Sequence, residues 1–181
     1  GVVTMTRGDR MAYHYSAEDA RRMGKTFEVL VKQAGVVMVD GEFNEDGSFP
    51  LAVMESSEIV VQVSTSATSI TNAYALIKRL SQQLGRRPFG ILVTNASEAE
   101  AKVVYDNMAT AASRYLAVQL TSMGSVPADE YLHRAARLGR SVVDAFPLAG
   151  ASVAFRRLAG RFALPGMSLP GRQVGSSHLG A

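Results

Sequence analysis

The sequence predicts an α/β fold in three layers, a mostly parallel sheet with helices on both faces. Two features of the central part of the chain lead to this prediction. Short apolar runs at 59–63 and 89–93 are typical of buried strands, and the stretch between them has apolar residues at helical spacing. Those residues are Ile70, Ala73, Tyr74, Ile77, Leu80 and Leu84. Because parallel strands need a long return connection, we interpret this stretch as a right-handed βαβ unit and expect the rest of the chain to repeat it.

Size and composition fit one globular domain, which we place at residues 1–163. Of the 181 residues, 47% are hydrophobic and 19% are charged, and no apolar run approaches the roughly 18 residues of a membrane span. The absence of cysteine excludes disulfides, thiolate zinc sites and cysteine nucleophiles, and it suits a cytoplasmic protein. The net charge is +3, and basic side chains concentrate after residue 129, where the sequence has seven arginines and only two carboxylates.

The first third of the chain is predicted to begin with a strand at 2–6. Ser16 is then a candidate cap for a helix, and an apolar run at 36–39 is predicted to be a second strand. Asp40 follows this run directly. The parallel strands of such a fold are covered on both faces, so we expect the predicted strands to be buried on both sides.

The next elements follow the central unit. Ser97 and Glu100 have the spacing of a capping box, which begins a helix that ends near Leu116. The residues predicted for its inner face are Val104, Met108, Ala111, Ala112 and Tyr115. A strand is predicted at 118–126. We expect the tyrosines of these helices to pack in the core rather than to form a stacking platform for nucleic acid.

Residues that end strands or cap helices predict the boundaries of the C-terminal elements. Pro127 ends the preceding strand, and Asp129 is a candidate cap for a helix at 130–138. A last helix is predicted at 151–163. The tail 164–181 is rich in proline, glycine and serine, and we expect it to be disordered.

Ligands of parallel sheets bind where the carboxyl ends of the strands meet. This rule selects Asp40, residues 64–66, Asn95, Pro127 and Asp129. Asp40 is placed to reach a magnesium ion or its water shell, and Asn95 offers an amide to a nucleotide base. Plainer explanations stay open: Asp40 as a loop cap and Asn95 as a turn residue. Pro127 and Asp129 are likewise explained by strand exit and helix capping.

The chain lacks the motifs of several enzyme classes. It has no G-x-x-x-x-G-K-[ST] run, no G-x-G-x-x-G turn after a strand, no G-x-S-x-G elbow and no H-E-x-x-H pair. A carboxylate without a phosphate-binding loop and its lysine would catalyse little phosphoryl transfer, because that chemistry depends on positioning and charge neutralisation.

Several strings nevertheless resemble the second half of MinD/ParA-type P-loop ATPases. They lie at 36–40, 68–79, 126–132 and 142–147 within a resemblance that covers about residues 1–163. The string at 68–79 is most similar to flagellar-number regulators of the FlhG/FleN type. The resemblance implies a P-loop NTPase-like fold that is incomplete at its N-terminus, and the first residue, Gly1, also suggests a piece of a longer protein.

The resemblance further implies ATP and Mg²⁺ as cofactors. By position, Asp40 belongs to the switch region that senses metal and γ-phosphate, Asn95 contacts the adenine, and the loop 127–129, with Pro127 and Asp129, wraps the base. Family members dimerise with nucleotide, so a homodimer, flagellar assembly proteins and the inner-membrane surface are the implied partners, with membrane contact through a helix such as 153–162. The alternative to membrane contact is that this helix packs on the sheet.

The segment after Asp40 departs from the family pattern. Three carboxylates follow within six residues, where family members carry small residues and glycines, and they would repel a phosphate. A regulator that binds flagellar partners without hydrolysing ATP is therefore an alternative. A nucleic-acid-binding module that uses the arginine-rich C-terminal part is a further alternative from another class.

Overall fold

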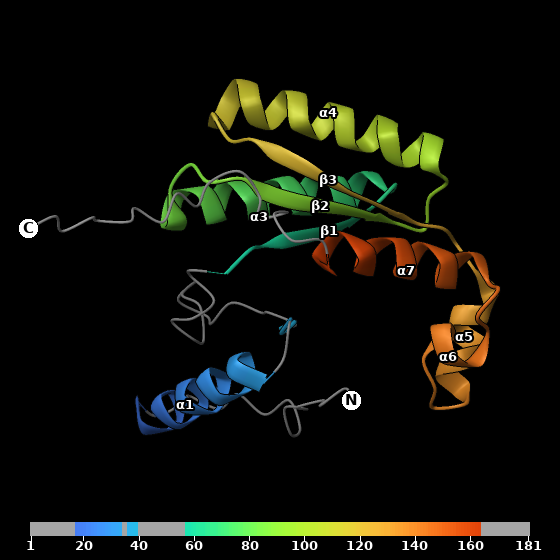
Figure 1. Cartoon of the computed structure of the whole chain (residues 1–181). Helices are drawn as coiled ribbons and strands as arrows, with labels where there is room; N and C mark the ends of the chain where they lie inside the picture. The colour runs from blue at the N-terminus through green and yellow to red at the C-terminus, as the bar shows by residue number, and fades with distance from the viewer. Residues whose placement is uncertain (1–16, 34–35, 40–56, 164–181) are drawn as a thin grey trace, which may run out of the picture. The chain divides into compact units, whose positions relative to one another are not determined.

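The structure, a computed structural model, describes residues 17–33, 36–39 and 57–163 (Figure 1). The chain divides into two units, Gly1–Ser57 and Glu58–Ala181. The domain boundary at 163 and the disorder of the tail stay predictions, since the tail lies outside the described residues, as do Ser16 and the predicted strand 2–6.

The described residues of the first unit contain one helix, α1 (Ala17–Gln33). The prediction of a strand at 36–39 is wrong: these residues have no regular secondary structure, and Met38 is 80% exposed. An apolar run forms a strand only where a neighbour completes its hydrogen-bond ladder.

The second unit alternates strands and helices. Their order is β1 (Val60–Ser64), α3 (Ala67–Leu84), β2 (Phe89–Thr94), α4 (Glu98–Leu116), β3 (Leu120–Val126), α5 (Glu130–Arg137), α6 (Val142–Ala145) and α7 (Gly150–Ala163). The strands form a parallel sheet in the order β1-β2-β3. The predicted α/β class and the central βαβ unit are confirmed. The short helix α6 was not predicted, because four residues are too few to show helical periodicity.

Side-chain caps fix where the helices begin. Ser66 accepts the backbone N–H of Ser69 at the start of α3. Ser97 and Glu100 form the predicted capping box of α4, in which each side chain accepts the backbone N–H of the other residue. Both hydrogen bonds from Ser97, one from its hydroxyl and one from its backbone, lower the pKa of Glu100.

Helices cover both faces of the sheet. Ile91 and Val93 on β2 are buried beside their β1 neighbours Val61 and Val63, so these four side chains share a face. Helices α3 and α4 pack on the strands and on each other. Leu92 points to the opposite face, where it packs against a buried cluster from β3, α5, α6 and α7. Figure 1 shows α7 across the sheet from α4, which completes the three predicted layers.

Two residue groups at the margins of the sheet are more exposed than the sequence predicts: one face of β1 and the side chain of Tyr115. β1 buries Val61 and Val63, but Val60 is 38% exposed and Gln62 is also exposed, so among the described elements of the second unit only one face of this strand is covered. The reason is that α7 packs against β3 rather than against β1. Tyr115 was predicted on the inner face of α4 and is 69% exposed. It lies in the last turn of α4, where helical periodicity continues, but its ring meets the guanidinium of Arg114, 5.4 Å from the ring centroid, rather than the core.

Candidate functional site

The three strands end together at one edge of the sheet. Ser64, Thr94 and Val126, the last residues of β1, β2 and β3, are aligned across the ladder. Asn95 follows β2, and the backbone N–H of the next residue, Ala96, donates to the carbonyl of Val126 at 3.4 Å. This hydrogen bond joins the loop after β2 to the end of β3. The structure therefore brings Asn95 and the loop 127–129 to one rim, as the position of their strands predicts.

Asn95 has a backbone conformation that few residues adopt. Its φ is 55°, in the left-handed region where asparagine is tolerated better than most side chains. The residue is exposed, and within the described part of the chain its side-chain amide has no hydrogen-bond partner. The turn geometry accounts for an asparagine here, and the amide remains available to a ligand.

The side chain of Asp129 joins the starts of two helices at the same rim. Its Oδ1 accepts the backbone N–H of Tyr131 at 2.9 Å, which caps α5, and its Oδ2 accepts the backbone N–H of Ala151 at 2.9 Å, in the first turn of α7. The hydrogen bond from Ala151, followed by that from Tyr131, lowers the pKa of Asp129. Helix capping, the plainer explanation of this residue, is thus confirmed, and both carboxylate oxygens are engaged by the protein.

Pro127 lies beside the start of α7. A Cβ atom added to Gly150 would be 3.4 Å from Cγ of Pro127 and 3.5 Å from Oδ2 of Asp129. The absence of a side chain at position 150 lets α7 approach the loop after β3 closely. The predicted residues of this loop are therefore held by α7, an element that the rim rule does not include.

Hydroxyl groups line the rim after β1. The hydroxyl of Ser69 accepts the backbone N–H of Ser64 at 2.9 Å, and Ser66 caps α3. A shallow cavity of about 410 Å³ opens over this segment and is lined by Gln62, Ser66, Thr68, Ser69, Asn72, Ala73 and Leu76. Sequence reasoning selected residues 64–66 and missed Asn72 and Gln62, which reach the cavity from the α3 and β1 surfaces.

Asp40, the remaining predicted site residue, lies outside the described residues. Its assignment to a switch region and to Mg²⁺ stays a prediction. Among the residues that the structure describes, no three or more histidine, cysteine, aspartate or glutamate side chains are grouped so that they could hold a metal ion.

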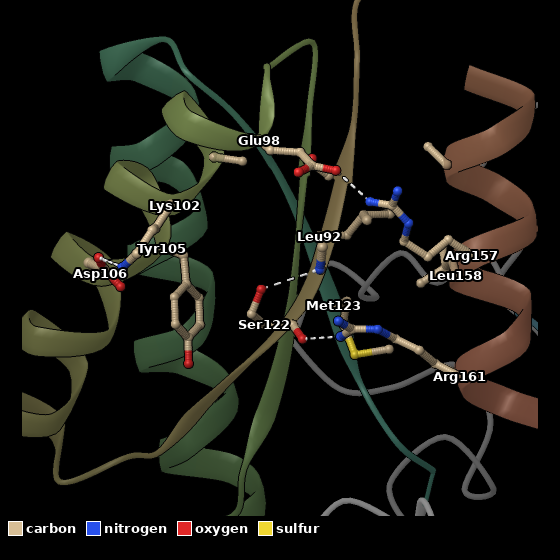
Figure 2. A pocket seen from close by; sticks show the side chains of 14 residues that line it. Leu92, Glu98, Lys102, Tyr105, Asp106, Ser122, Met123, Arg157, Leu158 and Arg161 are labelled. Atoms are coloured by element: carbon tan, nitrogen blue, oxygen red, sulfur yellow. Dashed lines mark hydrogen bonds and ion pairs between the residues drawn. The ribbon is translucent and has the colours of Figure 1, made fainter. Parts of the chain in front are cut away.

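A second cleft, of about 350 Å³, lies over β3 between α4 and α7 (Figure 2). Arg157 on α7 forms an ion pair with Glu98 at the start of α4, and Arg161 donates to the backbone carbonyl of Ser122. Packing of α7 on the sheet, the alternative to a membrane-binding helix, is confirmed by its contacts with β3. Sequence reasoning missed this cleft because its partners are 39 to 59 residues apart.

The fold is a parallel α/β domain, the class to which P-loop NTPase-like proteins belong. No family model matches the chain. Among curated proteins, it is 30% identical over 159 residues to the antiactivator FleN of Pseudomonas aeruginosa, a match that covers 87% of this chain. The chain is thus similar to FleN over most of its own length, which confirms the predicted resemblance to the FlhG/FleN type.

The match covers 57% of FleN, so the chain spans a little over half the length of this relative. Within the described residues, no helix has the length and hydropathy that crossing a membrane requires.

Proposed function

We propose that this chain belongs to a nucleotide-dependent regulator of flagellar number or placement. Two findings support the proposal: the relationship to FleN, whose name describes an antiactivator, and the rim at the carboxyl ends of the strands. The rim is the single structural observation that carries it, because parallel sheets bind nucleotides at this edge.

In this proposal ATP binds with its adenine at the rim. The amide of Asn95 would hydrogen-bond the base, since it is exposed and its loop is joined to the end of β3. The loop 127–129 would form the wall beside the base. Because both carboxylate oxygens of Asp129 already accept backbone hydrogen bonds, this residue would shape the wall rather than contact the base through its side chain.

The proposed mechanism is nucleotide-dependent dimerisation. ATP with Mg²⁺ would be held between two subunits, order the switch segment that includes Asp40, and change the surface shown to flagellar assembly proteins or to the inner membrane. The protein would be cytoplasmic and at most peripheral to the membrane. Each of these steps belongs to a protein of the length of FleN, and we expect this chain by itself to bind nucleotide weakly.

Asn95→Gly tests the adenine contact. Glycine adopts a φ of 55° without strain, so the variant removes the amide and keeps the turn. Binding of a fluorescent ATP analogue with Mg²⁺ to the natural full-length protein should weaken about tenfold, the effect of losing about 1.4 kcal/mol. Asn107→Ala, which changes an exposed asparagine in the middle of α4, should bind as the wild type does.

Two results would count against this assignment. If Asn95→Gly binds the analogue as tightly as the wild type, Asn95 is a turn residue only. If the wild-type full-length protein does not bind the analogue, the nucleotide-dependent function itself fails.

A regulator that binds its partner without hydrolysing ATP is the second candidate. The name antiactivator, which FleN carries, supports it, since an activator can be blocked by binding alone without ATP hydrolysis. The acidic segment after Asp40 also favours it. A phosphate-release assay separates the two candidates, since the ATPase releases phosphate with Mg²⁺ and the second candidate binds ATP, or partner alone, without release.

The nucleic-acid-binding alternative has less support from the arginines of the C-terminal part. Arg157 pairs with Glu98, Arg140 pairs with Asp144, and Arg134 stacks over aromatic rings. A steep fall of affinity for DNA or RNA with rising salt would revive this alternative.

A further inference from the structure

β3 is an edge strand of the described sheet, since it pairs with β2 on one side only. In a parallel ladder, alternate residues direct their backbone groups to the same neighbour. The backbone N–H of Phe89 on β2 donates to the carbonyl of Gln119. Leu120 and Ser122 therefore direct their N–H and C=O groups away from β2. Unpaired backbone groups in such a row are a template for adding another strand.

Side chains from the two flanking helices occupy the outward carbonyls of β3. The hydroxyl of Tyr105 on α4 donates to the carbonyl of Leu120 at 2.9 Å. Arg161 on α7 donates from Nη1 to the carbonyl of Ser122. In Figure 2, Tyr105 lies on the α4 side of the cleft and Arg161 reaches the strand from the α7 side. The edge is thus capped at two successive outward positions.

A third hydrogen bond and a local distortion reinforce the caps. The hydroxyl of Ser122 accepts the backbone N–H of Gly124 at 3.3 Å, so a polar side chain of the edge itself is turned back onto the strand. The register of β2 and β3 shifts between Ile91 and Leu92. Bulges and irregularities of this kind make an edge a poorer partner for another strand.

The charge on Arg161 adds a second obstacle. Glu98 pairs with Arg157 and Asp106 pairs with Lys102, whereas Arg161 has no carboxylate partner among the described residues. In a twofold contact between identical edges, each copy presents the same residues to the other. Two copies pairing through β3 would therefore bring both guanidinium groups, without carboxylate partners, into a partly desolvated interface, which is unfavourable.

We propose that Tyr105 and Arg161 prevent β3 from pairing with the β3 of a second copy of this chain. The caps work by satisfying the carbonyls that an added strand would need and by placing a positive charge on the edge. This role does not depend on nucleotide, and it concerns a surface distinct from the rim.

The double variant Tyr105→Phe/Arg161→Ala tests the proposal by sedimentation velocity over a series of protein concentrations. It exposes the carbonyls of Leu120 and Ser122 and removes the charge. We expect self-association with a dissociation constant at least about tenfold below that of the wild type. Hydrogen exchange should show slower exchange of the outward amides of Leu120 and Ser122 at high protein concentration, in the double variant only.

Two control variants separate edge pairing from other effects. Arg156→Ala removes an arginine from the same helix, but this side chain donates to the carbonyl of Pro147, away from β3. Ile77→Val trims the buried face of α3, a modest destabilisation that leaves both caps in place. Both controls should associate as the wild type does.

The proposal is overturned if the folded double variant associates no more than the wild type, or if either control associates as strongly as the double variant. Circular dichroism establishes that each variant is folded. If the double variant does not fold, Tyr105→Phe decides the question, because it removes one hydroxyl and opens only the carbonyl of Leu120. Unchanged association and unchanged exchange in that variant would refute the proposal.

Discussion

Asp129 and Ala151 are 22 residues apart in the chain, and Oδ2 of Asp129 accepts the backbone N–H of Ala151 at 2.9 Å. The other oxygen of the same carboxylate caps α5 through Tyr131. One side chain therefore joins the loop after β3 to the first turns of two helices. Pro127, a predicted wall of the nucleotide site, lies in the loop that this connection joins to α7.

Asp129→Ala should lower the melting temperature of the protein by several degrees. The variant leaves N–H groups at the starts of α5 and α7 without their acceptor, and buried or half-buried donors are costly to leave unsatisfied. Thermal unfolding followed by circular dichroism measures the effect. Asp106→Ala is the matched control, since its carboxylate forms only an exposed ion pair with Lys102 one turn away on α4. Equal melting temperatures for the two variants would contradict the connecting role of Asp129.

Stability should also depend on pH through Asp129 and Glu100. The pKa of each carboxyl is lowered in the folded protein, chiefly by Ala151 for Asp129 and by Ser97 for Glu100. A group whose pKa is lower in the folded state contributes stability above its unfolded pKa of about 4, and this contribution is lost as the pH falls through the folded pKa. Urea titrations from about pH 7 to about pH 3 should therefore show falling stability at the acid end.

Asp129→Asn tests the pH effect at one of these groups. The amide does not titrate, so the variant should be less stable than the wild type at neutral pH and should lose less stability on acidification. Parallel curves for the two proteins would show that Asp129 does not contribute to the acid transition.

Gly90→Ala should destabilise the sheet by about 1–3 kcal/mol, the usual cost of overpacking a core. A Cβ at position 90 would lie 2.9 Å from Cγ of Met123 and 3.1 Å from Cγ2 of Val60. Chemical denaturation gives the free energy of unfolding. Combining Gly90→Ala with Met123→Ala should cost less than the sum of the two changes, because the shorter side chain removes the clash. If the losses in unfolding free energy of the two single variants simply add in the double variant, the strain of Gly90→Ala does not come from contact with Met123.

Ser152→Ala should destabilise the protein by about 1–2 kcal/mol. The hydroxyl of Ser152 is completely buried and lies 2.9 Å from the carbonyl of Val142 and 2.7 Å from that of Phe146, so it joins α7 to both ends of α6. Ser81→Ala is the control, since its hydroxyl contacts only the carbonyl of Lys78 within α3. Denaturant midpoints for the two variants should differ clearly, and indistinguishable midpoints would remove α6–α7 coupling as the function of this hydroxyl.

The sequence predicted those elements whose signals lie within one or two helical turns. Ser97 and Glu100 are three residues apart, and their capping box formed as expected. The apolar run at 36–39 failed as a strand because strand formation needs a partner, which a local pattern does not contain. Tyr115 failed as a core residue because periodicity gives a face of the helix and not the extent of what covers it.

For the candidate site, strand order alone placed Asn95 and the loop 127–129 at one rim, since all parallel strands end at the same edge. Tertiary structure decided what the side chains do there. The carboxylate of Asp129 accepts hydrogen bonds from the starts of two helices, and Arg161 binds the edge of β3. Both contacts arise because α7 packs across the sheet, close to the loop after β3 and to β3 itself. These contacts join residues 22 and 39 positions apart in the sequence, so they depend on how the helices pack in the folded chain and not on a local sequence pattern.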